Sequence, residues 1–249
     1  DESLKRQCIL EIKDNEEQLE YKSDSVKNST FHHYPVPSEL QATLFDHQVE
    51  GFRWLCYLEE QGRGGLLADD MGLGKTIQVI TFLLHQKAHN KLKPTLIVLP
   101  IALIENWVEE IRKFAPSLMN RLYVHKGSGR LKSSDLISQF DIILTSYDTL
   151  KMDQLLLGKI KFQSIICDEA QNIKSHSSQR SRAIRAMQGN FRLAMTGTPV
   201  ENSLDELWAI MDFVQPGALG SLKEFRARYA DSKNYDELLK AIQPYYLRR

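Results

Sequence analysis

The sequence has 249 residues, 42% of them apolar and 26% charged, which is ordinary for a globular protein with a substantial core. Lysine and arginine balance aspartate and glutamate, 32 against 32, so bulk charge gives no sign of nucleic-acid binding, although it does not exclude a local basic groove. No apolar run approaches the roughly 20 residues that span a bilayer, and the N-terminus lacks a signal-peptide pattern. We therefore expect no membrane partner.

The same features, with three widely separated cysteines, favour free thiols in a reducing compartment. These cysteines are Cys8, Cys56 and Cys167, and their spacing is not that of metal ligands. We expect a cytoplasmic protein, which would be associated with the nucleoid in a bacterium or located in the nucleus of a eukaryote.

Residues 1–37 differ from the rest of the chain, because they are polar and charged and end in Tyr-Pro-Val-Pro, a sequence typical of an extended connector. We interpret them as a lead-in, or as the tail of an upstream segment.

From residue 38 onward, helical and strand patterns alternate. Residues 47–60 place Val49, Phe52, Leu55 and Leu58 on one helical face. Helices are also predicted over 76–86 and over 102–116, the second stopped by Pro116. Nearly continuous apolar strands are predicted over 64–69, 94–100, 121–125, 141–147, 163–170 and 191–197. Apolar strands separated by helices predict an α/β fold, with a mostly parallel sheet covered by helices on both faces.

After residue 200 the pattern predicts helices and no further strands. Ser203 with Glu206, and Ser221 with Glu224, have the spacing of a capping box, so each pair is expected to begin a helix. Residues 201–249 are therefore expected to form a helical protrusion.

The stretch DDMGLGKT at 69–76 joins a predicted strand to a predicted helix, which is the context of a phosphate-binding loop. Backbone N–H groups and the helix N-terminus would receive phosphate oxygens. Lys75 would reach the β- and γ-phosphates, and Thr76 would bind Mg²⁺. The expected ATP-binding residues of this loop are Met71, Gly72, Leu73, Gly74, Lys75 and Thr76.

One departure leaves an alternative open for this loop. The first glycine of the strict phosphate-loop pattern is replaced by Asp69, so a coincidental glycine-rich turn is the competing interpretation. We hypothesise that at least one carboxylate of Asp69 and Asp70 turns away from the phosphates and accepts neighbouring hydrogen bonds.

Two acids come directly after the apolar strand over 163–167. Asp168 could hold Mg²⁺ through water, and Glu169 could polarise the attacking water. Ligands bind at the carboxyl ends of the strands in open parallel sheets. An acid pair alone is a weak signal, but together with Lys75 it predicts a site for ATP and Mg²⁺ with Lys75, Asp168 and Glu169 as catalytic residues.

Two further features can be interpreted either as functional or as ordinary structural elements. Thr196, Gly197 and Thr198 end another apolar strand, where they could sense the γ-phosphate or simply form a turn. Gln48 lies on a predicted helix, where a glutamine is usually just solvated.

Taken together, these segments resemble the SWI/SNF-type family of superfamily-two DNA translocases, specifically its first RecA-like ATPase lobe. The sequences DEAQNIK and TGTPVEN are similar to those of the bacterial and archaeal branch. The resemblance covers residues 38–249. It rests on LADDMGLGKT, LIVLPIALIENWVEEIRKF, LTSYDTL, ICDEAQNIK and LAMTGTPVENSLDELWAIMDFVQPGALG.

The resemblance implies a RecA-like P-loop NTPase lobe over 38–200 and a protrusion over 201–249 that leads to a hinge with a second RecA-like lobe of the same chain. It implies that Gln48 reads the adenine, and that Gln171, Thr196, Gly197 and Thr198 couple hydrolysis to double-stranded DNA. The DNA-contacting residues it implies are Pro100, Asn106, Trp107, Thr145, Ser146 and Tyr147. For Ser146 and Tyr147 a simple strand-end turn is the alternative. A protein target on DNA would be a further partner.

The sequence departs from the family pattern at two places. Phe45 and His47 stand where the family often has Arg and Tyr, so Phe45 could stack on the base or be part of the core. Gln171 stands where many relatives have His, and an amide can still hydrogen-bond there.

Two other functions are weighed against the translocase. One is a lobe of a strand-separating helicase, and the other is a non-catalytic nucleotide-binding scaffold. Because no Gln-x-x-x-Arg-x-x-Arg pattern, which would supply the arginine fingers of a second lobe, follows residue 200, we expect this lobe alone to bind ATP weakly and to hydrolyse it very slowly.

Overall fold

The computed structural model describes residues 11–13, 16–18, 33–197, 204–231 and 233–249. Its centre is a sheet of seven parallel strands in the order β5, β6, β4, β7, β8, β3, β9. The strands are β3 (Gly65–Leu67), β4 (Thr95–Leu99), β5 (Leu122–His125), β6 (Ile142–Ser146), β7 (Lys161–Cys167), β8 (Gln188–Met195) and β9 (Tyr246–Leu247). The expected parallel α/β fold is confirmed.

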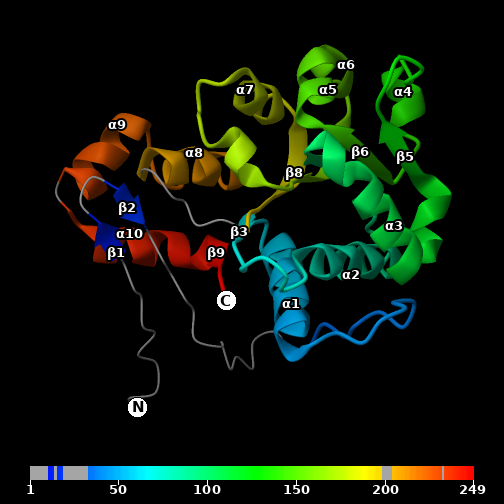
Figure 1. Cartoon of the computed structure of the whole chain (residues 1–249), viewed down its shortest axis with the longest axis horizontal. Coiled ribbons are helices and arrows are strands. Elements are labelled where there is room, and N and C mark those ends of the chain that lie inside the picture. The colour runs from blue at the N-terminus through cyan, green and yellow to red at the C-terminus, as the bar shows by residue number, and fades with distance from the viewer. Residues whose placement is uncertain (1–10, 14–15, 19–32, 198–203, 232) are drawn as a thin grey trace.

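Helices cover both faces of this sheet (Figure 1). On one face lie α1 (Asp46–Glu60), α2 (Lys75–Ala88) and α3 (Ile104–Phe114). On the other lie α4 (Ser134–Ile137), α5 (Tyr147–Met152), α6 (Gln154–Leu157), α7 (Gln179–Arg185) and α8 (Leu204–Val214). Short 3-10 segments span Ile101–Leu103, Pro116–Arg121, Ala170–Ile173 and Gln243–Tyr245, and a π-helical turn spans Arg226–Ala230.

The alternation of strand side chains explains why the strands are continuously apolar. In β4, Leu96 and Val98 belong to the apolar cluster beneath α5, α7 and α8. Ile97 and Leu99 belong to the cluster beneath α1, α2 and α3. Because successive side chains point to opposite faces and both faces are covered, every position of the strand is buried.

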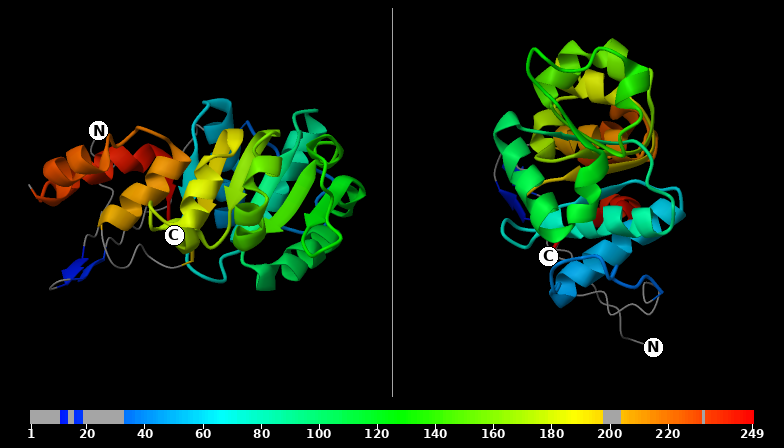
Figure 2. Two further views of the ribbon diagram at one scale, coloured as in Figure 1. Left: turned by 90° about the horizontal axis from the view of Figure 1, so that it is seen from above. Right: turned by 90° about the vertical axis from the view of Figure 1, so that its right-hand side faces the viewer.

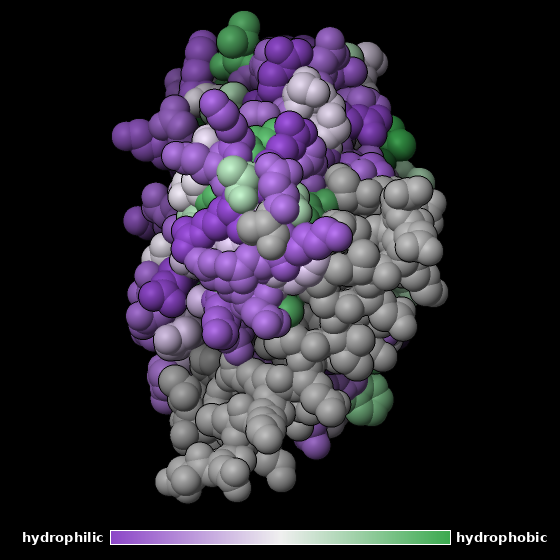
Figure 3. Space-filling view, turned by 90° about the vertical axis from the view of Figure 1, so that its left-hand side faces the viewer, coloured by the Kyte–Doolittle hydropathy of each residue, from purple (hydrophilic) through white to green (hydrophobic). Residues whose placement is uncertain are grey.

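The protrusion extends from one side of the sheet (Figure 2). It contains α8, α9 (Leu222–Phe225) and α10 (Tyr235–Ile242). Ser221 and Glu224 form the predicted capping box at the start of α9, whereas Ser203 lies outside the described residues. Where its residues are described, the outer face of this end of the molecule is largely hydrophilic (Figure 3), as expected for a solvated surface.

The expectation that no strand follows residue 200 is wrong. After the protrusion the chain returns to the sheet as β9, which pairs in parallel with β3, opposite Leu66 and Leu67. Two residues are too few to give a strand pattern in the sequence, and the pairing depends on contacts with a segment some 180 residues away. The end of the chain therefore lies beside the strand that leads into the phosphate loop (Figure 1).

The described part of the N-terminal segment contains two short strands and a residue that packs on the lobe. Strands β1 (Glu11–Lys13) and β2 (Glu16–Gln18) form a separate antiparallel pair. Tyr34 is buried in the cluster beneath α1, and its carbonyl oxygen accepts a hydrogen bond from Arg53 Nε at 3.1 Å. The last residues before position 37 thus pack on the lobe. No helix within the described ranges combines the length and apolarity that crossing a bilayer requires, and Cys56 and Cys167 are buried free thiols.

Candidate functional site

The loop between β3 and α2 has the geometry of a phosphate-binding turn. Gly74 precedes α2 with φ of 79°, a left-handed conformation that favours glycine. A Cβ atom there would lie 2.3 Å from Nε2 of Gln48, so any other residue would also have to displace that amide. Helix α2 is buried over Ile77–Gln86, and its N-terminus, with the positive end of the helix dipole, opens on the loop.

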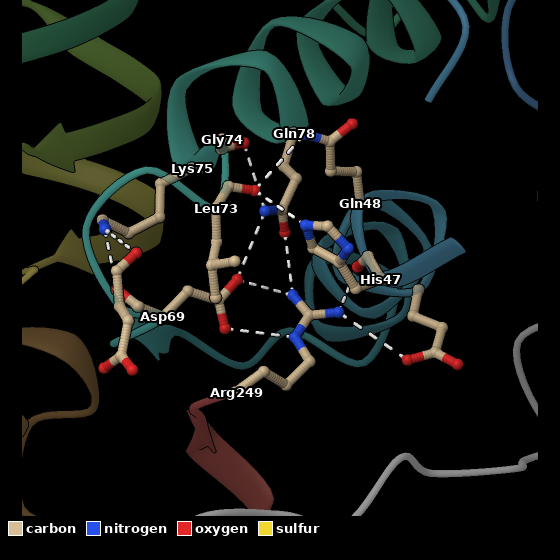
Figure 4. Close-up of polar contacts among 10 residues, drawn as sticks. His47, Gln48, Asp69, Leu73, Gly74, Lys75, Gln78 and Arg249 are labelled. Atoms are coloured by element: carbon tan, nitrogen blue, oxygen red, sulfur yellow. Dashed lines mark hydrogen bonds and ion pairs between the residues drawn. The ribbon is translucent and has the colours of Figure 1, made fainter. Parts of the chain in front are cut away.

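Lys75 is the first residue of α2, and its ammonium folds back over the loop (Figure 4). Nζ donates to the backbone oxygens of Asp69 at 2.7 Å and Asp70 at 3.2 Å. Burial lowers the pKa of Lys75, opposed by the charges of Asp69, Asp168 and other nearby carboxylates. The lysine is therefore held among hydrogen-bond acceptors at the point where the sequence predicts phosphate.

The two acids at the start of the loop are both paired. Asp69 is 0% exposed, and its carboxylate accepts bonds from Gln78 Nε2 at 3.2 Å and from Arg249 Nε and Nη2 at 3.1 and 2.7 Å. Arg248 Nη2 donates to Oδ1 of Asp70 at 3.2 Å. The hypothesis that at least one carboxylate accepts neighbouring hydrogen bonds is confirmed, and Asp69 does not line the cavity that Lys75 faces.

Asp168 directly follows β7, at the same edge of the sheet as the loop. Its Oδ2 accepts from Nε1 of Trp107 at 2.8 Å, and its Oδ1 accepts from the backbone N–H of Glu169 at 2.9 Å. Burial raises the pKa of Asp168, an effect that the neighbouring Glu169 charge reinforces and that these hydrogen bonds and Lys75 oppose. A desolvated carboxylate is thus held by two hydrogen bonds at the cavity that Lys75 also lines.

Glu169 is held in an uncommon conformation. Its φ of 51° is left-handed, which is costly for a residue with a side chain. Nε2 of Gln171 donates to Oε2 of Glu169 at 2.7 Å, and Oε1 of Gln171 accepts from the hydroxyl of Thr196 at 3.3 Å. Gln171 therefore links the acid that follows β7 to the threonine that follows β8. Thr198 lies outside the described residues.

Gln48 approaches the loop from α1. Its Oε1 accepts from the backbone N–H of Phe45 at 3.0 Å, and its Nε2 donates to the oxygen of Leu73 at 3.3 Å. Phe45 is 69% exposed, and its ring stacks on that of His47 with an interplanar angle of 7°. Phe45 is therefore not a core residue, and its aromatic face lies at the mouth of the cavity.

A cavity of about 780 Å³ connects these groups. Of the residues predicted from sequence it is lined by Gln48, Met71, Gly72, Gly74, Lys75, Thr76, Asn106, Trp107, Asp168, Glu169 and Gly197. It is also lined by Phe45, for which stacking on the base was one of two alternatives. The lining residues that the sequence did not indicate are Ala42, Thr43, Ile77, Leu103, Glu109, Glu110, Lys113, Phe114 and Met195.

Residues of α3 that line the cavity share one helical face, and of these Asn106 was predicted whereas Glu110 and Lys113 were not. Asn106, Glu110 and Lys113 recur at the spacing of that face, beside the apolar stripe that the sequence did show. Nδ2 of Asn106 donates to Oε1 of Glu110 at 3.0 Å, and burial raises the pKa of Glu110. The signal available in the sequence for these α3 residues was a stripe of polar residues next to the apolar stripe of the same helix.

Comparison with known proteins identifies the family. A family model described as the SNF2-related domain matches residues 47–249. The chain belongs to the SNF2-related family. It is 42% identical over 227 residues to YwqA of Bacillus subtilis (strain 168), named as an ATP-dependent helicase/translocase, a match that covers 87% of this chain and 24% of YwqA. It is 36% identical to the chromatin-remodeling ATPase INO80 of Candida albicans, with 86% of this chain and 17% of that protein covered.

The fold comparison agrees with the family. The SWI2/SNF2 ATPase core of Sulfolobus solfataricus in complex with dsDNA superposes with a TM-score of 0.79 and 39% identity, covering 87% of this chain and 46% of that one. The expected RecA-like lobe of the SWI/SNF type is thus confirmed. The chain spans about a quarter or less of these two curated relatives and under half of the solved core.

Within this SNF2-type lobe, four of the six residues expected at the DNA surface are buried. Trp107 is 1% exposed and bonds Asp168. The hydroxyl of Thr145 donates to His125 O at 2.9 Å, Ser146 caps α5, and the hydroxyl of Tyr147 donates to Asp168 O at 2.5 Å. These four side chains are buried within the lobe, and their contribution to a DNA surface stays a prediction. Pro100 is half-buried and Asn106 is exposed.

Proposed function

We propose that this chain is the ATP- and Mg²⁺-binding lobe of a motor that translocates on double-stranded DNA or remodels complexes on it, and that it needs a second lobe for efficient hydrolysis. The observation that carries the proposal is the convergence of the half-buried Lys75 and the buried Asp168 on one cavity, where burial disfavours the charged form of each. A triphosphate with its cation would satisfy both groups.

The residues present fit ATP and Mg²⁺. The loop amides from Met71 to Thr76 and the N-terminus of α2 would receive phosphate oxygens, and the ammonium of Lys75 would exchange the two loop carbonyls for phosphate oxygens. Mg²⁺ usually binds one or two protein oxygens together with phosphates and waters, and when bound it neutralises the charge that develops on the phosphates. Thr76 and Asp168 would supply the protein oxygens.

Glu169 would orient the attacking water. Its carboxylate is fixed by Gln171, and Gln171 is fixed in turn by Thr196, so a shift at the end of β8 would reach Glu169 through two hydrogen bonds. Gln171, Thr196, Gly197 and Thr198 remain our proposal for the coupling of hydrolysis to DNA. Gln48, with Phe45 beside it, remains our proposal for the adenine end of the cavity.

Double-stranded DNA is proposed as the track because the solved relative binds it. Pro100 and Asn106 would lie near the phosphate backbone, and contacts there position a protein without specifying sequence. Trp107, Thr145, Ser146 and Tyr147 would act indirectly, by holding the strand ends on which such contacts depend. The second lobe would belong to the same chain, and a protein target on DNA is a further proposed partner.

A strand-displacement comparison on the intact protein tests the proposal. A double-stranded DNA translocase displaces the third strand of a triplex in an ATP-dependent way and leaves a plain duplex closed. Opening of the plain duplex would favour a strand-separating helicase. Nucleotide binding without hydrolysis in the presence of DNA would favour a scaffold.

A further inference from the structure

Arg249 lies where the end of the described chain meets the phosphate loop. The pairing of β9 with β3 continues beyond the strands, since Ala68 N donates to Leu247 O at 2.7 Å and Asp70 N donates to Arg249 O at 3.2 Å. The backbone of 247–249 therefore runs alongside the first residues of the loop. This places the arginine side chain against Asp69 and not in solvent.

The guanidinium of Arg249 contacts three elements at once (Figure 4). Its Nε and Nη2 form a two-bond fork on the carboxylate of Asp69, at 3.1 and 2.7 Å. Nη2 also donates to Oε1 of Gln78 on α2 at 3.0 Å, and Nη1 donates to the carbonyl oxygen of His47 on α1. A fork on a carboxylate fixes orientation as well as charge, which a lysine does not do.

Gln78 completes the arrangement. Its Nε2 donates to Oδ2 of Asp69 at 3.2 Å and to the oxygen of Gly74 at 3.1 Å. The first residue of the loop and the residue just before α2 are therefore joined through one side chain. Gly51 of α1 gives room for this, because a Cβ atom there would lie 1.7 Å from Oε1 of Gln78 and 2.7 Å from Nη2 of Arg249.

Asp69, which is bonded to Arg249, also accepts a hydrogen bond from Lys75. The carboxylate of Asp69 bonds Arg249, and its backbone oxygen accepts from Nζ of Lys75 at 2.7 Å. Asp69 is fully buried and the side chain of Arg249 is 11% exposed, so the pair is shielded from water. Without the guanidinium, a buried carboxylate would remain uncompensated beside Lys75 and would compete with phosphate for the lysine.

We propose that Arg249 is a positioning residue for nucleotide binding, one that sets the phosphate loop and Lys75 through Asp69 and ties them to the segment that follows the protrusion. The proposal rests on the proposed function of the site as an ATP site. It adds that the carboxylate of Asp69, at the start of the loop, is neutralised by Arg249, which lies 180 residues later in the sequence. Displacement of residues 246–249 is therefore expected to change the affinity for nucleotide.

The test uses the intact protein and the dissociation constant of a fluorescent ATP analogue with Mg²⁺, together with kcat and KM for ATP. All are measured below the unfolding midpoint of each variant. Arg249→Ala is expected to weaken analogue binding and to raise KM by roughly 10-fold or more. Adding Asp69→Asn is expected to return both values to within about threefold of the wild type, because no buried unpaired charge remains; the other acid near Arg249, Glu50 at 3.7 Å, is 39% exposed. Arg226→Ala, which removes an exposed partner of Asp205 in the protrusion, is the matched control and is expected to stay within about twofold.

The results separate this inference from the proposed function. If the wild type binds the analogue but does not hydrolyse ATP, only the proposed motor function is contradicted. The role of Arg249 is still decided by the dissociation constant of Arg249→Ala relative to that of the wild type. Binding by Arg249→Ala within twofold of the wild type, or a loss that Asp69→Asn does not reverse, overturns the inference. If Arg249→Ala unfolds at the assay temperature, Arg249→Lys decides, with a rise in the dissociation constant of about threefold expected and wild-type affinity contradicting it.

Discussion

The indole Nε1 of Trp107 donates a hydrogen bond of 2.8 Å to Oδ2 of Asp168, and both side chains are buried. The bond joins α3 to the end of β7, and it leaves the carboxylate with one oxygen bonded to the indole and the other to the backbone N–H of Glu169. Because a buried carboxylate with fixed donors cannot rotate freely, Trp107 orients the proposed Mg²⁺ ligand.

Trp107→Phe separates this orienting role from DNA contact. The loss of a hydrogen bond to a charged, buried group is expected to destabilise the lobe by roughly 1.5–3 kcal/mol and to lower kcat about 10-fold. The salt dependence of DNA binding is expected to be unchanged, since no phosphate contact is lost. Measurements of chemical unfolding, ATP turnover and the salt slope check this, with Trp54→Phe in the same apolar cluster as the control. A reduced salt slope would instead support the prediction that Trp107 belongs to the DNA surface.

Asp168→Asn tests whether the buried carboxylate of Asp168 makes the stability of the lobe depend on pH. Burial raises the pKa of Asp168 in the folded state above its ordinary value, so the folded state binds this proton more tightly than the unfolded state. The wild type therefore loses stability as pH rises from the ordinary carboxyl range through the raised pKa. The variant lacks this loss, so its unfolding free energy relative to wild type is expected to increase between about pH 3 and neutral pH in the absence of nucleotide. If the unfolding free energy of the variant relative to wild type stays constant or decreases as pH rises, the pKa of Asp168 is not raised in the folded state.

Gln171→Ala tests the link between Glu169 and Thr196. Both bonds of the bridge are lost while the loop and Asp168 are untouched. We expect DNA-stimulated kcat to fall about 10-fold with KM for ATP within about threefold, the pattern of an interaction that matters mainly in the transition state. Gln188→Ala, an exposed glutamine on β8, is the control. An increase in KM with kcat unchanged would place Gln171 in ground-state binding.

Most of the sheet was predictable because every strand of it except β9 carries its own signal. The runs that became β3, β4, β6, β7 and β8 are largely apolar, which only a strand covered on both faces tolerates. The proximity of Lys75 and the acid pair was predictable because each follows an apolar strand, and the carboxyl ends of parallel strands share one edge of the sheet.

The remaining features depend on contacts between distant segments. Nothing near Arg249 in the sequence indicates Asp69, 180 residues earlier, and a two-residue strand such as β9 has no period to detect. Trp107 fits an apolar helical stripe equally well whether it contacts DNA, the core or Asp168. Its indole N–H needed a buried acceptor, and only the packing of α3 against the end of β7 identifies that acceptor as Asp168.

The 249-residue chain by itself is expected to be a very poor ATPase. An arginine finger from a second lobe contributes roughly 10³ to 10⁵ in rate, or about 4–7 kcal/mol of barrier. Turnover of this chain alone is therefore expected to be slower than that of the intact protein by at least about 10³-fold in the presence of DNA. A turnover of several per second by the lobe alone, stimulated by DNA and lost in Lys75→Ala, would contradict the need for a second lobe.

The most direct measurement of the central claim is steady-state ATP hydrolysis by the intact protein, with and without double-stranded DNA, for the wild type and Lys75→Ala. Lys87→Ala is the matched control, because it removes the same charge from the other end of α2, where Lys87 pairs with Glu39 on the surface. The account predicts DNA-stimulated hydrolysis that falls roughly 10²- to 10³-fold in Lys75→Ala and is unchanged in Lys87→Ala. Hydrolysis that DNA does not stimulate, or that survives the loss of Lys75, would contradict it.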